Sequence, residues 1–254
     1  FASPRSSRRS VAATSVRRGS NSRRTLPEFE GAEPVYLRPR HRPSRGPYVK
    51  MVQRLRAQAR EMRRMVSLDM QLYAVFPRQY HRISPKRSGW SLFFYLFFTM
   101  HMFPSVVLYR LQRFFYDSGL SRLATAVSRI NHIIYGVTIG HEVRSSGALL
   151  IAHGHVVLDG YTKLGHEVVI NPFVTLGISN SDEHPFELWG PVIGDHVNIG
   201  TGAKIVGKVH IGDGAKIGAN AVVVHDVPAY HTAVGVPAHS FLSTGPYPYR
   251  VGTD

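Results

Sequence analysis

Histidine is the residue type best suited to chemistry in this chain, because the sequence holds 14 histidines and no cysteine. A neutral imidazole can take a proton near pH 7, so histidine is the usual general base for activating a hydroxyl group. The lack of cysteine excludes disulfides, thiolate nucleophiles and cysteine-based metal sites. Among these histidines are His153, in the sequence Ile-Ala-His-Gly, and His184, in Ser-Asp-Glu-His-Pro. No metal is expected.

A six-residue repeat predicts the scaffold that must position these histidines. Branched apolar residues recur every six positions in two blocks: Leu158, Leu164, Ile170, Leu176 and then Ile193, Ile199, Ile205, Ile211, Ile217, Val223. A period of six fits neither a helix nor a simple alternating strand. It fits a solenoid whose short strands are separated by tight turns and bury one narrow core. We therefore expect a mainly β chain with a β-helix over residues 136–240 and a C-terminal tail over 241–254.

The repeat is interrupted once, and His184 lies in the interruption. Leu176 and Ile193 are 17 positions apart, which is not a multiple of six. Residues from about Ile178 to Pro191 are therefore expected to leave the solenoid as a loop. Loops on a rigid scaffold commonly carry substrate contacts.

An α-helical region is expected over residues 49–135, before the β-helix. Its first part is a basic amphipathic stretch, which predicts a helix lying on a membrane or on RNA, or one with a solvated arginine face. Residues 88–109 contain no Asp, Glu, Lys or Arg, a length that could span a bilayer. Pro104 interrupts this run and His101 adds polarity, so a buried helix pair or an interface segment is favoured. Two amphipathic helices, broken at Asp117–Gly119, complete the region.

The positive charge of the chain is concentrated at its beginning. Residues 1–65 hold 17 Lys/Arg against 4 Asp/Glu, whereas the rest of the chain holds 14 against 12. Residues 1–48 are a basic Ser/Arg-rich arm whose composition is typical of an organelle transit peptide or of a partner-bound tail. Because the sequence does not begin with Met, a processed product or a fragment is expected. The arm predicts a mitochondrial or other organellar protein, the alternative being a cytoplasmic one.

Three stretches resemble a known family. They are VVLYRLQRFFYDSGLSRLATAVSRINHIIYGVTIG, LLIAHGHVVLDG and PVIGDHVNIGTGAKIVGKVHIGDGAKIGANAVVVHDVPAYHTAVGVPAH. Together they closely resemble the hexapeptide-repeat acyltransferases of the serine O-acetyltransferase type. The resemblance implies a left-handed parallel β-helix, a homotrimer, and transfer of an acetyl group from acetyl-CoA to a hydroxyl group. It also implies that His153 is the general base and that His184 is a second active-site histidine. For the CoA arm it suggests contacts at Thr201, Lys216 and Ala219.

The sequence departs from the family pattern in places that bear on activity. The serine-specific members carry an aspartate directly before the base histidine, where this chain has Ala152. A second family carboxylate, in the motif that opens the β-helix, aligns with Thr138. A histidine without a carboxylate partner is a weaker base, since loss of such a partner costs about four orders of magnitude in serine proteases. The chain also ends in Gly-Thr-Asp rather than in the isoleucine-terminated tail of the serine enzymes.

Two functions remain open from the sequence. The first is a trimeric acetyl-CoA-dependent O-acetyltransferase with a serine-like or sugar acceptor. The second is a catalytically degenerate structural subunit of an organellar assembly, such as a mitochondrial ribosome or a respiratory complex, in which the arm contacts RNA or neighbouring subunits. A membrane-associated acyltransferase, with lipid contact at residues 88–109, is a third possibility.

Overall fold

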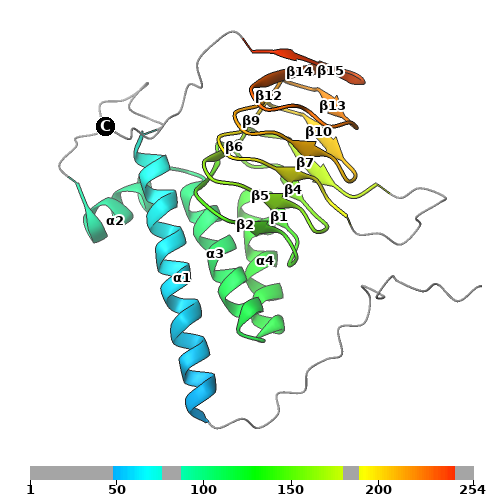
Figure 1. Ribbon diagram of the computed structural model, residues 1–254. Coiled ribbons are helices and arrows are strands. Elements are labelled where there is room, and N and C mark those ends of the chain that lie inside the picture. Colours follow the sequence, from blue (N-terminus) through cyan, green and yellow to red (C-terminus); the bar gives the residue numbers. More distant parts are fainter. Residues whose placement is uncertain (1–47, 76–86, 180–188, 244–254) are drawn as a thin grey trace, which may run out of the picture. The chain divides into compact units, whose positions relative to one another are not determined.

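The six-residue repeat folds into a parallel β-solenoid that follows four helices in this computed structural model (Figure 1). The structure describes residues 48–75, 87–179 and 189–243. The chain divides into two units, residues 1–45 and 46–254, and the first unit lies wholly outside the described residues. The proposed roles of the basic arm therefore stay predictions.

Each coil of the solenoid contributes one short strand to each of three sheets. Sheet A has the order β1 (Val137–Ile139), β4 (Val156–Leu158), β7 (Thr175–Gly177), β10 (Lys204–Val206), β13 (Val222–Val223). Sheet B holds β2 (Arg144–Ser145), β5 (Lys163–Leu164), β8 (Val192–Ile193), β11 (His210–Ile211). Sheet C holds β3 (Leu149–Ile151), β6 (Val168–Ile170), β9 (Asn198–Ile199), β12 (Lys216–Ile217), β14 (His231–Gly235), β15 (Ala238–Leu242). All neighbours pair in parallel except the β14–β15 hairpin.

The repeat positions form the core of the solenoid. All ten of the branched residues that define the repeat are buried, with no more than 3% of their surface exposed. Burying one such side chain stabilises the fold by about 1.5–3 kcal/mol relative to leaving it in water. The predicted β-helix is confirmed.

Four helices precede the solenoid: α1 (Tyr48–Val75), α2 (Gly89–Thr99), α3 (Phe103–Asp117), α4 (Ser121–Tyr135). The uncharged run is divided between α2 and α3, because Pro104 lies in the first turn of α3, where its missing N–H is tolerated. In the described residues no single helix is long and apolar enough to cross a membrane, although α2 and α3 together pass that test despite a 114° bend. The predicted break near Asp117–Gly119 separates α3 from α4.

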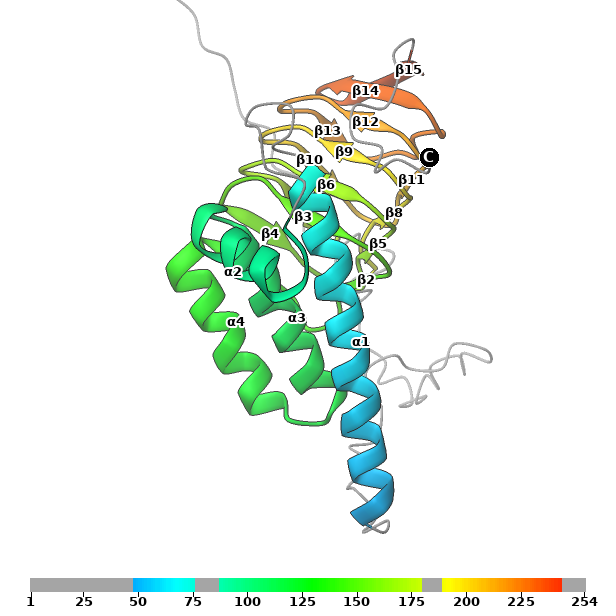
Figure 2. The ribbon, with the colours of Figure 1, turned by 90° about the vertical axis from the view of Figure 1, so that its left-hand side faces the viewer.

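Side chains of α1 and α3 bond to the free edge of the first coil, beneath which these helices lie (Figures 1 and 2). An unpaired strand edge exposes backbone groups that need partners. Asp69 accepts a hydrogen bond from the Leu149 amide at 2.9 Å, and the Tyr73 hydroxyl both donates to Ile151 O and accepts from Ile151 N. Arg110 donates to Gly147 O at 2.9 Å. The helices thus replace the hydrogen bonds that a preceding coil would make.

A buried ion pair links the two capping helices. Arg110 makes two hydrogen bonds of 2.8 Å to the Asp69 carboxylate, with 3% and 1% of the two residues exposed. Burial alone would lower the pKa of Arg110, but the charge of Asp69, its hydrogen bonds to the guanidinium and weaker nearby interactions together outweigh burial and raise the pKa. Burial also raises the pKa of Tyr73, so its hydroxyl stays protonated and can donate.

The interruption of the repeat falls between two strands of the third coil. β7 ends at Gly177 and β8 begins at Val192, in agreement with the expected departure from the six-residue phase. Residues 180–188, with His184, lie outside the described residues.

Candidate active site

The corner at which the chain passes from sheet C to sheet A gathers most of the predicted site residues. Four successive turns stack there: residues 152–155, 171–173, 200–202 and 218–220. Their backbones are joined, since Gly202 N donates to Pro172 O at 2.9 Å and Asn220 N donates to Thr201 O at 2.8 Å. We call this stack of turns the C–A edge.

Three predicted site residues occupy equivalent places along the C–A edge. Each stands two positions after an aligned strand residue: His153 after Ile151, Thr201 after Ile199 and Ala219 after Ile217. Their side chains are exposed. With neighbouring strands about 4.8 Å apart, Thr201 lies about 10 Å from His153 along the solenoid axis and Ala219 about 14 Å. An extended ligand lying along this edge would meet all three.

Lys216 lies close to the last turn of the C–A edge, residues 218–220. It belongs to β12, pairs with Asn198 and Thr232 in sheet C, and is partly buried. Its sequence position places it three residues before Ala219. An ammonium group here would be suited to a phosphate.

The turn that carries His153 is one residue longer than the other three. Residues 152–155 separate Ile151 from Val156, whereas only three residues fill each later turn. The last residue of each turn has a positive φ, at His155, Phe173, Gly202 and Asn220. The extra residue is thus accommodated beside His153, at Gly154. A Cβ on Gly154 would lie 2.3 Å from Tyr135 O, so glycine is needed for the turn to approach α4.

His153 has no carboxylate partner in the described part of the chain. Ala152, where the family has aspartate, packs against the core. Thr138, at the place of the second carboxylate, forms a hydrogen bond of 2.9 Å between its hydroxyl and His132 Nδ1. No hydrogen bond to the His153 ring occurs among the described residues. The histidine is accessible to a substrate, and nothing there fixes its tautomer.

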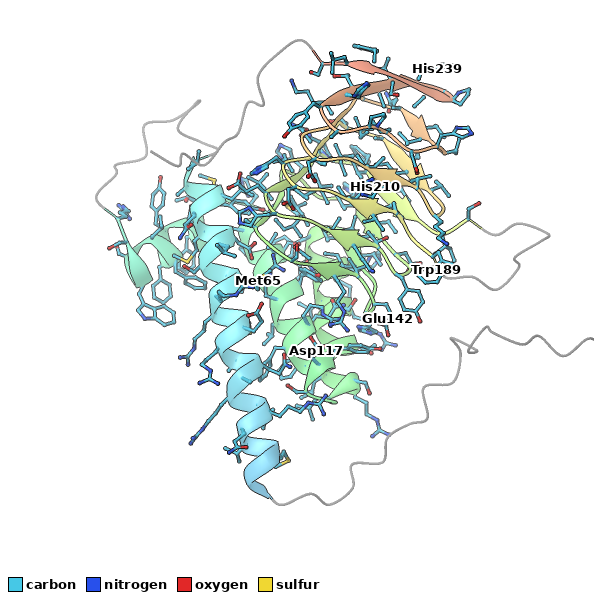
Figure 3. The ribbon with its side chains drawn as sticks, viewed as in Figure 1. Met65, Asp117, Glu142, Trp189, His210 and His239 are labelled. Carbon is cyan, nitrogen blue, oxygen red and sulfur yellow. The ribbon has the colours of Figure 1, made fainter. Side chains whose placement is uncertain are left out.

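The segment that carries His184 leaves from the other side of sheet A. Its described flanks, Ser179 and Trp189, lie between β7 and β8, where the chain passes from sheet A to sheet B. Trp189 contacts the Tyr161 ring, with centroids 6.1 Å apart, and the Lys208 ammonium lies 5.2 Å from the Trp189 centroid. Figure 3 shows Trp189 and Glu142 on this side, away from α1. Within one chain, therefore, His153 and the ends of the His184 segment lie on opposite sides of sheet A.

His141 is assigned no function from the sequence, but the structure places it where the helices meet the solenoid. Its ring stacks on Tyr116, with centroids 5.2 Å apart, and bonds to Gln112 at 3.2 Å and Thr125 at 3.3 Å. Burial, and then the nearby charge of Arg113, lower the pKa of His141. The polar residues of α3 are the sequence signal that could have indicated this contact. They face the first coil instead of solvent.

In the described segments, no group of three His, Cys, Asp or Glu side chains is placed so that it could hold a metal ion. The chemistry available at the C–A edge is proton transfer by one exposed histidine, beside a surface of small residues and backbone. The six-residue repeat and the solenoid place the chain in the class of hexapeptide-repeat proteins.

Comparison with known proteins supports that class. Residues 190–225 match the family described as bacterial transferase hexapeptide (six repeats). The serine acetyltransferase of Bacillus licheniformis is 36% identical over 139 residues, covering 54% of this chain and 60% of its own length. That of Bacillus subtilis is 30% identical over 154 residues, covering 60% of this chain and 70% of its own length.

Solved structures agree with the sequence matches. The serine acetyltransferase of Neisseria gonorrhoeae in complex with serine has a TM-score of 0.58 at 30% identity, covering 75% of this chain and 73% of that one. A serine acetyltransferase in complex with CoA has a TM-score of 0.59 at 26% identity, covering 76% and 74%. This chain belongs to the serine acetyltransferase family of hexapeptide-repeat transferases. It spans about three fifths of the length of most of the curated relatives it matches.

Proposed function

We propose that this protein is an acetyl-CoA-dependent O-acetyltransferase that uses the C–A edge as its donor site and His153 as its base. The observation that carries the proposal is the alignment of His153, Thr201 and Ala219 on one accessible edge. His184 is the proposed second histidine of the site.

The proposed reaction is a direct transfer. The acceptor hydroxyl oxygen attacks the thioester carbonyl carbon while His153 takes the hydroxyl proton. The carbon–sulfur bond then breaks, CoA leaves as a thiolate and the imidazolium returns the proton to sulfur. The products are the acetyl ester and CoA thiol, so the base is regenerated. Backbone amides of the turns are the available donors for the transient oxyanion.

The acceptor is proposed to be a small hydroxylated molecule. The serine bound to the Neisseria enzyme favours a hydroxy amino acid. The chain lacks the carboxylates that the serine-specific members carry beside His153 and at Thr138. A sugar hydroxyl is therefore the other candidate acceptor.

A homotrimer is the proposed assembly. α4 presents an apolar stripe to solvent, with Leu123 48%, Ile130 45%, Ile133 78% and Ile134 63% exposed. Leu123, Ile130 and Ile134 recur at helical spacing on one side of α4, next to the buried Val127, and Ile133 borders them. Such a stripe on a monomer marks a protein interface, and a second copy of this chain is the proposed partner.

The test is CoA release from acetyl-CoA with a panel of acceptors that includes serine, threonine and several sugars. Activity with at least one acceptor is expected. His153→Ala should lower it by at least about 100-fold, the usual range for a general base. The matched control is His210→Ala, since His210 is an exposed histidine on sheet B.

A second candidate function, the structural subunit, is favoured by one observation, the absence of a carboxylate beside His153. In that case the basic arm would hold RNA or acidic subunits of an organellar assembly. Complete inactivity of the wild-type chain with every acceptor, together with salt-resistant co-purification with a large particle, would favour this candidate over the enzyme.

A further inference from the structure

The helical region carries an aromatic surface that neither the solenoid nor the proposed chemistry uses. Four residues of α2 share one outward face: Trp90 is 75% exposed, Phe94 53%, Phe97 36% and Phe98 80%. Their spacing of four, seven and eight positions puts them on one side of the helix. The opposite side anchors α2 through the fully buried Leu96. In Figure 2, α2 lies in front of α3, on the side that faces the viewer.

An apolar groove opens beside this aromatic face. It has a volume of about 730 Å³ and lies between α1, α2 and α3. Its apolar walls include Met62, Val66, Met70, Trp90, Phe93 and Leu111. The volume is within the range of about 300–1,000 Å³ that small-molecule sites in proteins occupy. The groove is large enough for an aliphatic chain.

The charged residues around the groove are all positive. Arg63 and Arg87 line it, and no Asp or Glu is among its described lining residues. Arg56 and Arg60 precede Arg63 at helical spacing, so the three guanidinium groups share one side of α1. Each of the three is exposed, and none makes a hydrogen bond or ion pair within the described residues. The site therefore combines an apolar cavity with a surface suited to anions.

We propose that α1 and α2 dock the protein on a membrane surface rich in anionic lipid, with a lipid acyl chain in the groove. α2 has 11 residues and is about 16 Å long, too short to cross a hydrocarbon core of about 30 Å. It instead suits insertion parallel to the surface, with its aromatic face among the acyl chains and the arginines at the head groups. Tyr95 adds a contact, since the Arg87 guanidinium lies 4.3 Å from its ring centroid.

A second copy of this chain fits the same surface less well. A two-fold contact uses the same surface on both copies, so it would gather Arg56, Arg60 and Arg63 of both copies in or beside one interface. Like charges facing each other across an interface oppose association. Anionic lipid instead neutralises the charges and covers the aromatic face.

The first experiment is flotation of the full-length protein with vesicles of phosphatidylcholine alone or with about 30% phosphatidylglycerol. Because the basic arm can bind anionic vesicles by charge alone, binding is also measured at about 0.5 M salt, which screens that contribution. Phe98→Asp should lower the partition coefficient at least about tenfold, the loss expected when one buried aromatic side chain is replaced. Phe241→Asp, an exposed aromatic position on β15, is the matched control and should bind like the wild type. Equal binding of the Phe98 and Phe241 variants would overturn the proposal.

The second experiment locates the insertion. The chain has two tryptophans, so Trp189→Phe leaves Trp90 as the only one. Its emission should shift to the blue on adding anionic vesicles and be quenched by brominated acyl chains. Unchanged emission would contradict membrane docking. Emission that is already blue-shifted without lipid would show that another part of the chain covers the aromatic face of α2. If that blue shift depends on protein concentration, a second copy of the chain covers the face instead.

Discussion

His153, the proposed general base, lacks the usual carboxylate partner, and the basicity of its imidazole depends on the residues next to it. An adjacent carboxylate orients an imidazole and stabilises its protonated form. In this chain Ala152 occupies the neighbouring place and packs against the core, and Thr138 bonds to His132. We therefore expect an enzyme that is active but slow, because its base lacks a carboxylate partner.

Ala152→Asp should raise kcat, by about tenfold or more within the four orders of magnitude that such a partner can supply. Steady-state kinetics with the best acceptor measure this gain. Ala152→Asn is the uncharged control, and an equal gain from both variants would show that the charge is irrelevant.

His141 makes stability depend on pH. Its pKa is lowered in the folded state by burial and by Arg113, so the unfolded chain binds the proton more readily. Its contribution is fully present above the unfolded value of about 6.5 and is lost as pH falls through the lower folded value. The groups that face it are Arg113, Glu142, Tyr116, Gln112 and Thr125.

His141→Gln should flatten the fall in Tm between pH 7.5 and pH 5. The control is His210→Gln, at an exposed position. An unchanged slope in the His141 variant would assign the acid sensitivity to other groups.

Secondary-structure elements that follow one periodic pattern could be predicted from the sequence. The contacts between two elements could not. The repeat from Leu158 to Val223 placed the core correctly, because an inward position recurs every six residues whatever the side chains outside do. The polar face of α3 did not reveal its target. Arg110 and Gln112 look like solvent-facing residues of an amphipathic helix, yet they are fully or almost fully buried against the first coil. The extra residue in the turn at His153 could not be predicted from the sequence either, since only the pairing register of the two flanking strands reveals it.

Asp69→Asn should lower the free energy of unfolding by about 3–5 kcal/mol, because it leaves the buried Arg110 charge without its partner. The amide oxygen can still accept from Leu149, so the loss reports the charge more than the cap. Glu61→Gln, in the exposed pair with Arg64, is the control and should cost less than about 1 kcal/mol. Chemical denaturation of both variants measures the difference, and equal losses would contradict the stabilising role of the buried ion pair.

At the scale of the whole molecule, the protein is a stiff solenoid with three different surfaces. The C–A edge is the proposed chemical surface, the α4 stripe the proposed contact between copies, and the α1–α2 side the proposed lipid surface. The family could be read from the sequence motifs. The exposed surfaces of α4 and α2 could not be predicted from the sequence. Whether a helix face is exposed depends on whether the solenoid covers it.

Ile133→Asp should break the proposed trimer, since it places a charge at the most exposed residue of the apolar stripe. Light scattering should give a trimer mass for the wild type and for Leu242→Asp, a control at an exposed apolar position on β15. A monomeric wild type, or a trimeric Ile133 variant, would contradict the proposed interface.

One experiment separates chemistry from CoA binding at the C–A edge. CoA release from acetyl-CoA and the best acceptor is measured for the wild type and for His153→Ala, together with the affinity of each for CoA by calorimetry. We expect a rate at least about 100-fold lower in the variant, with CoA affinity essentially unchanged. A variant that keeps the wild-type rate, or a wild type that neither binds CoA nor releases it, would contradict the proposed role of His153 and of the C–A edge.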